Sequence, residues 1–218
     1  MNMNTQNLIE QLSADLRPVT PIRPFSGVAL VLITALLVAL CTLVIFGGRA
    51  DLMAGTPNPI VVIRGSLLVL LGLATSIAAA RAARPTHGAG QNGWMWALAA
   101  ALVMPLVAAM LFCYHLLTAT PFKHGDMDFG YYAHCFGISV TGALLIGAGL
   151  TLWLRRGAPV NSVRAGWLVG LASGSFGTFA YSLNCPSNSI YYIGLIYSLA
   201  VGVCAVTGRL IVPRIIRW

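Results

Sequence analysis

Charged residues are scarce in this chain. Its 218 residues include 13 Lys and Arg and only 5 Asp and Glu, together 8% of the sequence, whereas a soluble domain carries about a quarter charged residues. The long apolar stretches contain no Asp, Glu or Lys. This composition excludes an ordinary soluble domain. It also disfavours a transporter or proton pump, because such proteins bury an ionisable residue near the membrane midplane.

Catalytic and nucleic-acid-binding patterns are missing as well. The five cysteines form no C-x-x-C pair, and the four histidines form no H-x-x-x-H repeat. The net charge is +8, but no run of Lys and Arg is dense enough to follow a phosphate backbone. We therefore expect a protein that is not an enzyme, holds no cofactor and makes no direct contact with nucleic acid.

Apolar runs occupy most of the sequence, which is 58% hydrophobic with a mean hydropathy of +0.82. Each run approaches the ~20 residues that a helix needs to cross the hydrocarbon core. They cover residues 27–47, 59–80, 94–114, 133–154, 163–181 and 190–212. The expected fold is an all-α membrane protein, with a bundle of six transmembrane helices over residues 27–218. Acidic residues precede the first run, so we expect a retained span and not a cleaved signal peptide.

Basic residues predict the orientation of this bundle. With six spans, ten of the 13 Lys and Arg fall on the side of the two termini, and three, Arg49, Arg64 and Lys123, fall on the other side. Loops on the cytoplasmic side carry the excess of positive charge. Both termini are therefore expected in the cytoplasm, and the basic charge is explained by topology and by contact with anionic lipid in the bilayer.

A short amphipathic helix is predicted before the first span, over residues 5–16. Its apolar side consists of Leu8, Ile9, Leu12 and Leu16. Its polar side is acidic, and Arg17 is its only basic neighbour, whereas helices that lie on membranes favour Lys and Arg there. A helix that binds a protein partner is therefore favoured over a membrane-lying or disordered head. Residues 1–26 form the expected cytoplasmic head with its proline-rich spacer.

Small residues and one arginine suggest how the spans pack. Glycines repeat every four residues in the fifth run, at Gly166, Gly170 and Gly174, a pattern that permits close approach of helices inside the bundle. Pro105 should kink the third span. Arg64 lies about one turn inside the second span and is expected to extend to the outer surface. Pairing with Asp51, Asp126 or Asp128 is the alternative.

Two cysteines far apart in the sequence, Cys135 and Cys185, are both expected at the outer face. Three interpretations remain open for them. They form a permanent disulfide worth about 2–4 kcal/mol, or a reversible redox pair, or a soft-metal site in which the two thiolates are helped by His134, His124 and His115. Cys41 and Cys204 lie mid-span and are expected to be packing residues.

Four segments carry a family resemblance: Leu8 to Pro18, His134-Cys135-Phe136, Tyr181 to Pro186 and Arg156 to Pro159. Through them the whole chain resembles the NrsF family of six-span anti-sigma factors of the bacterial inner membrane. The resemblance implies a multi-pass inner-membrane protein whose cytoplasmic head holds an extracytoplasmic-function (ECF) sigma factor. The implied sigma-binding residues are Leu8, Ile9, Leu12, Asp15, Leu16 and Arg17.

The resemblance also implies a sensor. By their flanking residues, Cys135 and Cys185 correspond to the functional cysteines of the family, and the implied input is heavy-metal or oxidative stress, so a heavy-metal ion is a candidate signal. Cys113 is an additional thiol that departs from this pattern. We expect a change at the two sensor thiols to shift the packing of the last three spans and weaken binding by the head. The alternative function is a small transporter or channel with an outer metal-binding vestibule.

Overall fold

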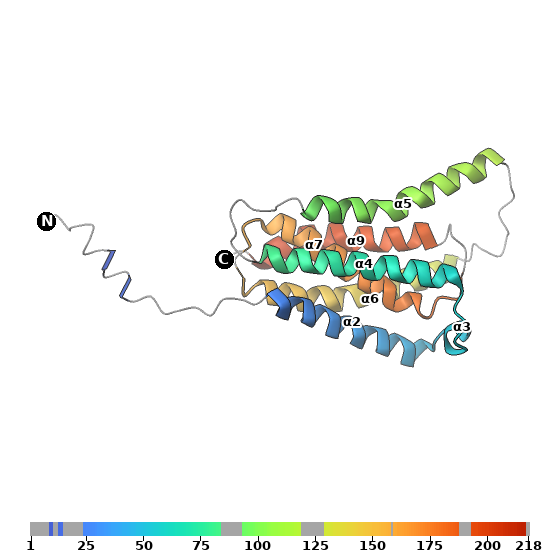
Figure 1. The fold of residues 1–218 in the computed structure, drawn as a ribbon, viewed down its shortest axis with the longest axis horizontal. Helices are drawn as coiled ribbons and strands as arrows, with labels where there is room; N and C mark the ends of the chain where they lie inside the picture. Colours follow the sequence, from blue (N-terminus) through green and yellow to red (C-terminus); the bar gives the residue numbers. More distant parts are fainter. Residues whose placement is uncertain are drawn as a thin grey trace.

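The computed structural model describes residues 9–10, 13–14, 24–83, 93–118, 129–157, 159–187 and 193–216. Long helices run side by side in a bundle (Figure 1). They are α2 (Pro24–Phe46), α4 (Pro59–Ala82), α5 (Gly93–Thr118), α6 (Phe129–Leu154), α7 (Ser162–Ser182) and α9 (Ser198–Ile216). The short α3 (Ala50–Met53) follows α2, and a π-helical turn, η2 (Ile193–Tyr197), leads into α9. The described residues contain no strand, so the all-helical prediction is confirmed.

Four segments among the described residues are long and apolar enough to cross a membrane, whereas the sequence led us to expect six spans. They are 24–46, 59–82, 132–154 and 194–216. The backbone of α5 is described throughout, but its side chains only in part. Helix α7 has 16 buried residues out of 21, so most of its surface meets other helices and not lipid. Gly, Ser and Thr are tolerated there, and they lower the hydropathy of α7 below that of a lipid-facing span.

Helix α7 is the centre of the bundle and packs closely against α9. A Cβ atom added to Gly166 would lie 2.7 Å from the Gly208 oxygen of α9. One added to Gly170 would meet the Cys204 oxygen, and one added to Gly174 would lie 2.9 Å from the Cys204 Cβ. The glycine repeat therefore serves internal packing, as predicted, because only glycine lets the two backbones come this near.

Helix α2 lies at the edge of the bundle (Figure 1). Its buried residues follow a single stripe: Gly27, Val31, Ala35, Ala39 and Thr42. Near its start, the indole nitrogen of Trp153 in α6 donates to the Ser26 hydroxyl at 3.1 Å. The same indole ring covers Gly27, where an added Cβ would be 2.7 Å away. Small residues and one aromatic contact thus hold α2 against α6.

The bundle has two distinct ends. Helix α2 starts at the end where α9 finishes (Figure 1). At the opposite end, the backbone nitrogen of Arg49, just after α2, donates to the Leu183 oxygen, just after α7, at 3.2 Å. We call this second end the thiol end, because Cys185 lies there. Helix α5 contains Pro105 and is bent, as predicted, with its second half leaning away from the bundle (Figure 1).

The predicted head is described only in small part. Residues 9, 10, 13 and 14 are helical, and the Ser13 hydroxyl donates to the Glu10 carbonyl at 3.0 Å. The Ile9 side chain is 61% exposed. The other implied sigma-binding residues, Leu8, Leu12, Asp15, Leu16 and Arg17, lie outside the described residues.

Candidate functional site at the thiol end

Both thiols that the sequence placed at the outer face are fully buried, whereas we expected them to reach the surface. Cys135, in the second turn of α6, and Cys185, three residues beyond α7, are each 0% exposed. They belong to one core cluster that also contains Tyr181 and Tyr197. None of the five cysteines forms a disulfide. The two thiols therefore share a site as expected, but a reagent reaches them only when the surrounding chain moves.

The Cys185 segment folds back on the end of α7. The backbone nitrogens of Asn184 and Cys185 donate to the Tyr181 oxygen at 2.9 and 3.1 Å. The last carbonyls of any helix lack partners within that helix and carry the negative end of its dipole. The carbonyl oxygens of Ser182, Cys185 and Ser187 therefore require donors from elsewhere in the fold.

Arg64 supplies several of these donors, which corrects the expectation that it extends to the surface. Its side chain is buried, with 2% of its surface exposed. Nη1 donates to the Ser187 oxygen at 2.9 Å, and Nη2 donates to the Ser182 oxygen at 2.9 Å and to the Cys185 oxygen at 3.2 Å. The guanidinium turns inward because the end of α7 offers a cation both acceptors and a favourable dipole.

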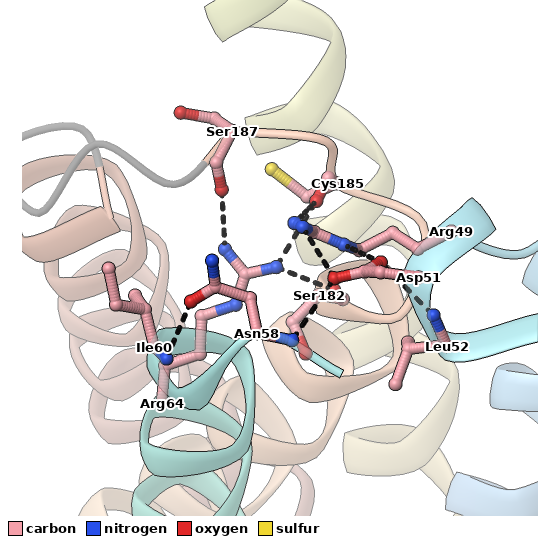
Figure 2. A network of polar contacts seen from close by, with 9 residues as sticks. All are labelled: Arg49, Asp51, Leu52, Asn58, Ile60, Arg64, Ser182, Cys185 and Ser187. Carbon is pink, nitrogen blue, oxygen red and sulfur yellow. Dashed lines mark hydrogen bonds and ion pairs between the residues drawn. The ribbon is translucent and has the colours of Figure 1, made fainter. Parts of the chain in front are cut away.

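Arg49 binds the same segment from the other side. Its Nη1 donates to the Cys185 oxygen at 2.7 Å, and the residue is 8% exposed. Its Nε and Nη2 donate to the two carboxylate oxygens of Asp51 at 2.7 and 2.9 Å. Two guanidinium groups thus converge on one carbonyl oxygen (Figure 2). We call Arg49, Arg64 and the carbonyls that they bind the arginine clamp.

Asp51 orients Arg49 within the clamp. Besides the paired contact with Arg49, its carboxylate accepts from the backbone nitrogens of Leu52 at 3.1 Å and of Asn58 at 3.3 Å. The hydrogen bond from Arg49 is the main reason that the pKa of Asp51 falls from 3.8 to about 2. The same hydrogen bond raises the pKa of Arg49. The pair therefore stays ionised at any physiological pH.

Tyr197 closes the site from η2. Its ring lies beneath the Arg64 guanidinium, with the Cζ atom 5.7 Å from the ring centroid, a distance typical of cation–π contact. The hydroxyl lies close to the Cys185 thiol, and the residue is 1% exposed. The π-helical turn that ends at Tyr197 is of a kind that is frequent at functional sites.

Hydrogen bonds join α7 and the segment after it to the end of α2 and to the residues that follow α2. Arg49 contributes its backbone bond to Leu183 in addition to its side-chain contacts. The Asn184 side-chain nitrogen donates to the Gly47 oxygen at 2.6 Å, and the Thr42 hydroxyl donates to the Ala180 oxygen at 3.3 Å. Gly47 ends α2 with a φ of 78°, a left-handed conformation that glycine adopts without strain. The thiol segment is thus fastened directly to α2.

Among the described residues, no other metal-capable side chain joins the two thiols in a metal-ion site. His134 is exposed, and its ring meets Phe46 of α2 edge-on, with 5.5 Å between centroids. No three His, Cys, Asp or Glu residues gather as a metal-ion site in the described part of the chain. Cys41 and Cys113 are exposed, whereas Cys204 is buried. The side chains of His115, His124, Asp126 and Asp128 lie outside the described residues.

Comparisons with known proteins agree on one family. The family model described as "NrsF: Negative regulator of sigma F" matches residues 12–218. The chain belongs to the NrsF family. It is 31% identical over 224 residues to "Anti-sigma-F factor NrsF" of Caulobacter vibrioides, which covers 99% of this chain and 100% of that protein. No solved structure matches the chain. The family predicted from the head and cysteine segments is confirmed, and it is a family of regulators, not of enzymes.

Proposed function

We propose that this protein is a membrane-bound anti-sigma factor that sequesters an ECF sigma factor at the cytoplasmic face of the bacterial inner membrane. The observation that carries the proposal is the family match over residues 12–218, together with a relative aligned along its whole length whose name is that of an anti-sigma factor. Four apolar helices suited to a membrane support the location. In this proposal both termini are cytoplasmic and the thiol end faces outward.

The head, residues 1–26, is the proposed sigma-binding element, and residues 27–218 form the sensor. Four apolar side chains, Leu8, Ile9, Leu12 and Leu16, would each contribute about 1.5–3 kcal/mol on full burial, or about 6–12 kcal/mol together. Association and ordering of the head cost an amount of similar size. Binding by the head is therefore marginal, which suits a switch that a few kcal/mol of coupling can reverse.

Cys135 and Cys185 are the proposed sensor of heavy-metal or oxidative stress. A soft metal cation would replace the two thiol protons and bind both sulfurs. His134 is the proposed third ligand. A two-electron oxidant would instead take two electrons and both protons while the disulfide bond forms. Shared burial of the thiols in one cluster supports either reaction. Both require the Cys185 segment to open first, because neither thiol is exposed.

The experiment is a pull-down of the cognate sigma factor by the full-length protein in detergent. Wild type should retain the sigma factor, and a variant with Leu8, Leu12 and Leu16 changed to Ala should lose it while still accumulating in the membrane. Retention by that variant would show that the head is not the binding element.

Sensing is tested with Cys135→Ser and Cys185→Ser, using Cys113→Ser as the control for an exposed thiol. The first two should lose the transcriptional response to cadmium ions and to diamide, and the control should keep it. An unchanged response in both sensor variants would refute the sensor role.

A further inference from the structure

We propose that Arg49, which follows α2, and Arg64 of α4 are positioning residues that hold the Cys185 segment in place beside the end of α2, and that α2 carries the state of the thiols to the head. This inference rests on the proposed function, because it concerns how the sensor reaches the sigma-binding element. It replaces the route through the last three spans that the sequence suggested.

The first step concerns what a reaction at Cys185 must break. The thiol is 0% exposed, and its own carbonyl oxygen accepts from Arg49 at 2.7 Å and from Arg64 at 3.2 Å. Any group added to the sulfur needs volume in a closed cluster, since protein interiors are close-packed. The segment can provide that volume only by moving, and movement of Cys185 pulls its carbonyl away from both guanidinium groups.

The second step concerns which helix then loses its support. The segment after α7 accepts from the Arg49 backbone at Leu183, and its Asn184 side chain donates to Gly47, the residue that ends α2. These two bonds hold the end of α2 to the segment, whereas the Thr42 bond joins α2 to Ala180 of α7 itself. Movement of the segment therefore releases that end of α2.

The third step compares α2 with the other helices around the thiols. Helix α7 is enclosed, and its glycines place its backbone against that of α9. This close approach restricts movement of the two helices relative to each other. Helix α2 is at the edge, with five buried residues in 23. It is the helix around the thiol site that is best able to move as a rigid rod.

The fourth step links α2 to the sigma-binding element. The proposed head, residues 1–26, is continuous with α2, which begins at Pro24. A helix of this length is about 35 Å long, so it spans the distance between the two ends of the bundle. Near its start, the contacts of Ser26 and Gly27 with Trp153 offer a pivot. Release of α2 at the thiol end therefore changes how the head is presented at the other end.

Hydrogen exchange of the full-length protein in nanodiscs tests this directly. In a background with Cys41, Cys113 and Cys204 changed to Ala, the reagent is methyl methanethiosulfonate. Its methylthio group joins the Cys185 sulfur, methanesulfinate leaves, and the thiol proton passes to the buffer. Exchange of the Arg49 amide, which donates to Leu183, should accelerate about tenfold or more as this local structure opens. Amides of α7 beside α9 should keep their protection.

A matched pair of variants tests the attachment of the Cys185 segment to the end of α2 without any reagent. Asn184→Asp removes the donor to the Gly47 oxygen and should accelerate exchange at Arg49 in the unmodified protein. Asn161→Asp is the control, because Asn161 acts as an acceptor from the Arg164 nitrogen, a role that aspartate keeps. Arg64→Lys should act like Asn184→Asp, since one ammonium cannot reproduce the geometry of the guanidinium contacts.

The outcomes separate this inference from the proposed function. Unchanged exchange at Arg49, while mass spectrometry shows Cys185 methylthiolated, would overturn the inference and leave the pull-down result untouched. In cells, Asn184→Asp should make sigma-dependent transcription independent of diamide at an unchanged protein level. A full diamide response in Asn184→Asp, together with its loss in Cys185→Ser, would also overturn the inference while supporting the sensor.

Discussion

Replacement of Arg64 by methionine is predicted to destabilise the folded bundle. Arg64 is the donor to the Ser182 and Ser187 oxygens, and the Cys185 oxygen keeps its bond from Arg49. A buried acceptor that loses its donor costs about 1–3 kcal/mol, so two cost about 2–6 kcal/mol. Burial of the apolar methionine side chain recovers about 1.5–3 kcal/mol of this. The central values of these two ranges give a net loss of about 2 kcal/mol.

There is also a physical reason to expect that Arg64→Met could stabilise the bundle. Taking a guanidinium out of water costs several kcal/mol, and replacement of buried charges by apolar residues sometimes stabilises a protein. In this case the acceptors are backbone carbonyls, which the substitution cannot remove. The prediction is therefore that unsatisfied carbonyls outweigh the relief from burying a charge.

Reversible unfolding in mixed detergent and SDS micelles measures the difference. Arg209→Met is the control, because the Arg209 Cζ also lies over an aromatic ring, that of Trp167 at 5.4 Å, while its side chain is exposed. Arg209→Met should change the free energy of unfolding by less than about 1 kcal/mol, as expected of an exposed site. An Arg64→Met protein that is as stable as wild type would refute the reasoning about the clamp.

Three further predictions concern other parts of the fold. Gly166→Ala should cost about 1–3 kcal/mol of unfolding free energy because its Cβ meets the α9 backbone, whereas Gly137→Ala, with open space around it, should not destabilise. Gly47→Ala, at a φ of 78°, should cost about 1–2 kcal/mol in the same unfolding assay. Asp51 has a lower pKa in the folded state, about 2, than its usual 3.8. The stability difference between wild type and Asp51→Asn should therefore be constant above pH 3.8 and vanish as the pH falls to 2 in thermal unfolding.

Periodicity and composition predicted the helices well, because both are local properties of the sequence. The glycine repeat of α7 and the proline of α5 had the consequences expected of them. Among the described residues, four of the six predicted spans meet the length and apolarity of a membrane-crossing helix. The hydropathy of a helix indicates how well it suits contact with lipid. Helix α7 is instead surrounded by other helices, and close backbone packing holds it in the bundle.

The environment of the thiols could not be predicted in the same way. Arg64 donates to the Ser182 oxygen, which lies 118 positions away in the sequence. No local sequence pattern predicts that the end of α7 lies beside the start of α4. Counting positive residues for topology treats Arg49 and Arg64 as surface charges, although both are buried. The one available signal was that they are two of only three basic residues expected on that side.

The acceptors in the arginine clamp are backbone carbonyls, and this determines which of its residues can be substituted. The clamp depends on the identity of the donors, because only a planar guanidinium provides several fixed N–H groups. It does not depend on the side chains of the accepting residues, because every residue has a carbonyl. Ser182→Ala loses only the hydroxyl bond to the Phe179 oxygen and keeps the acceptor for Arg64. Exchange of the Arg49 amide should therefore stay at the wild-type rate in Ser182→Ala and rise in Arg64→Lys. Equal rises in the two variants would mean that side-chain packing, and not the arginine clamp, holds the thiol segment against α2.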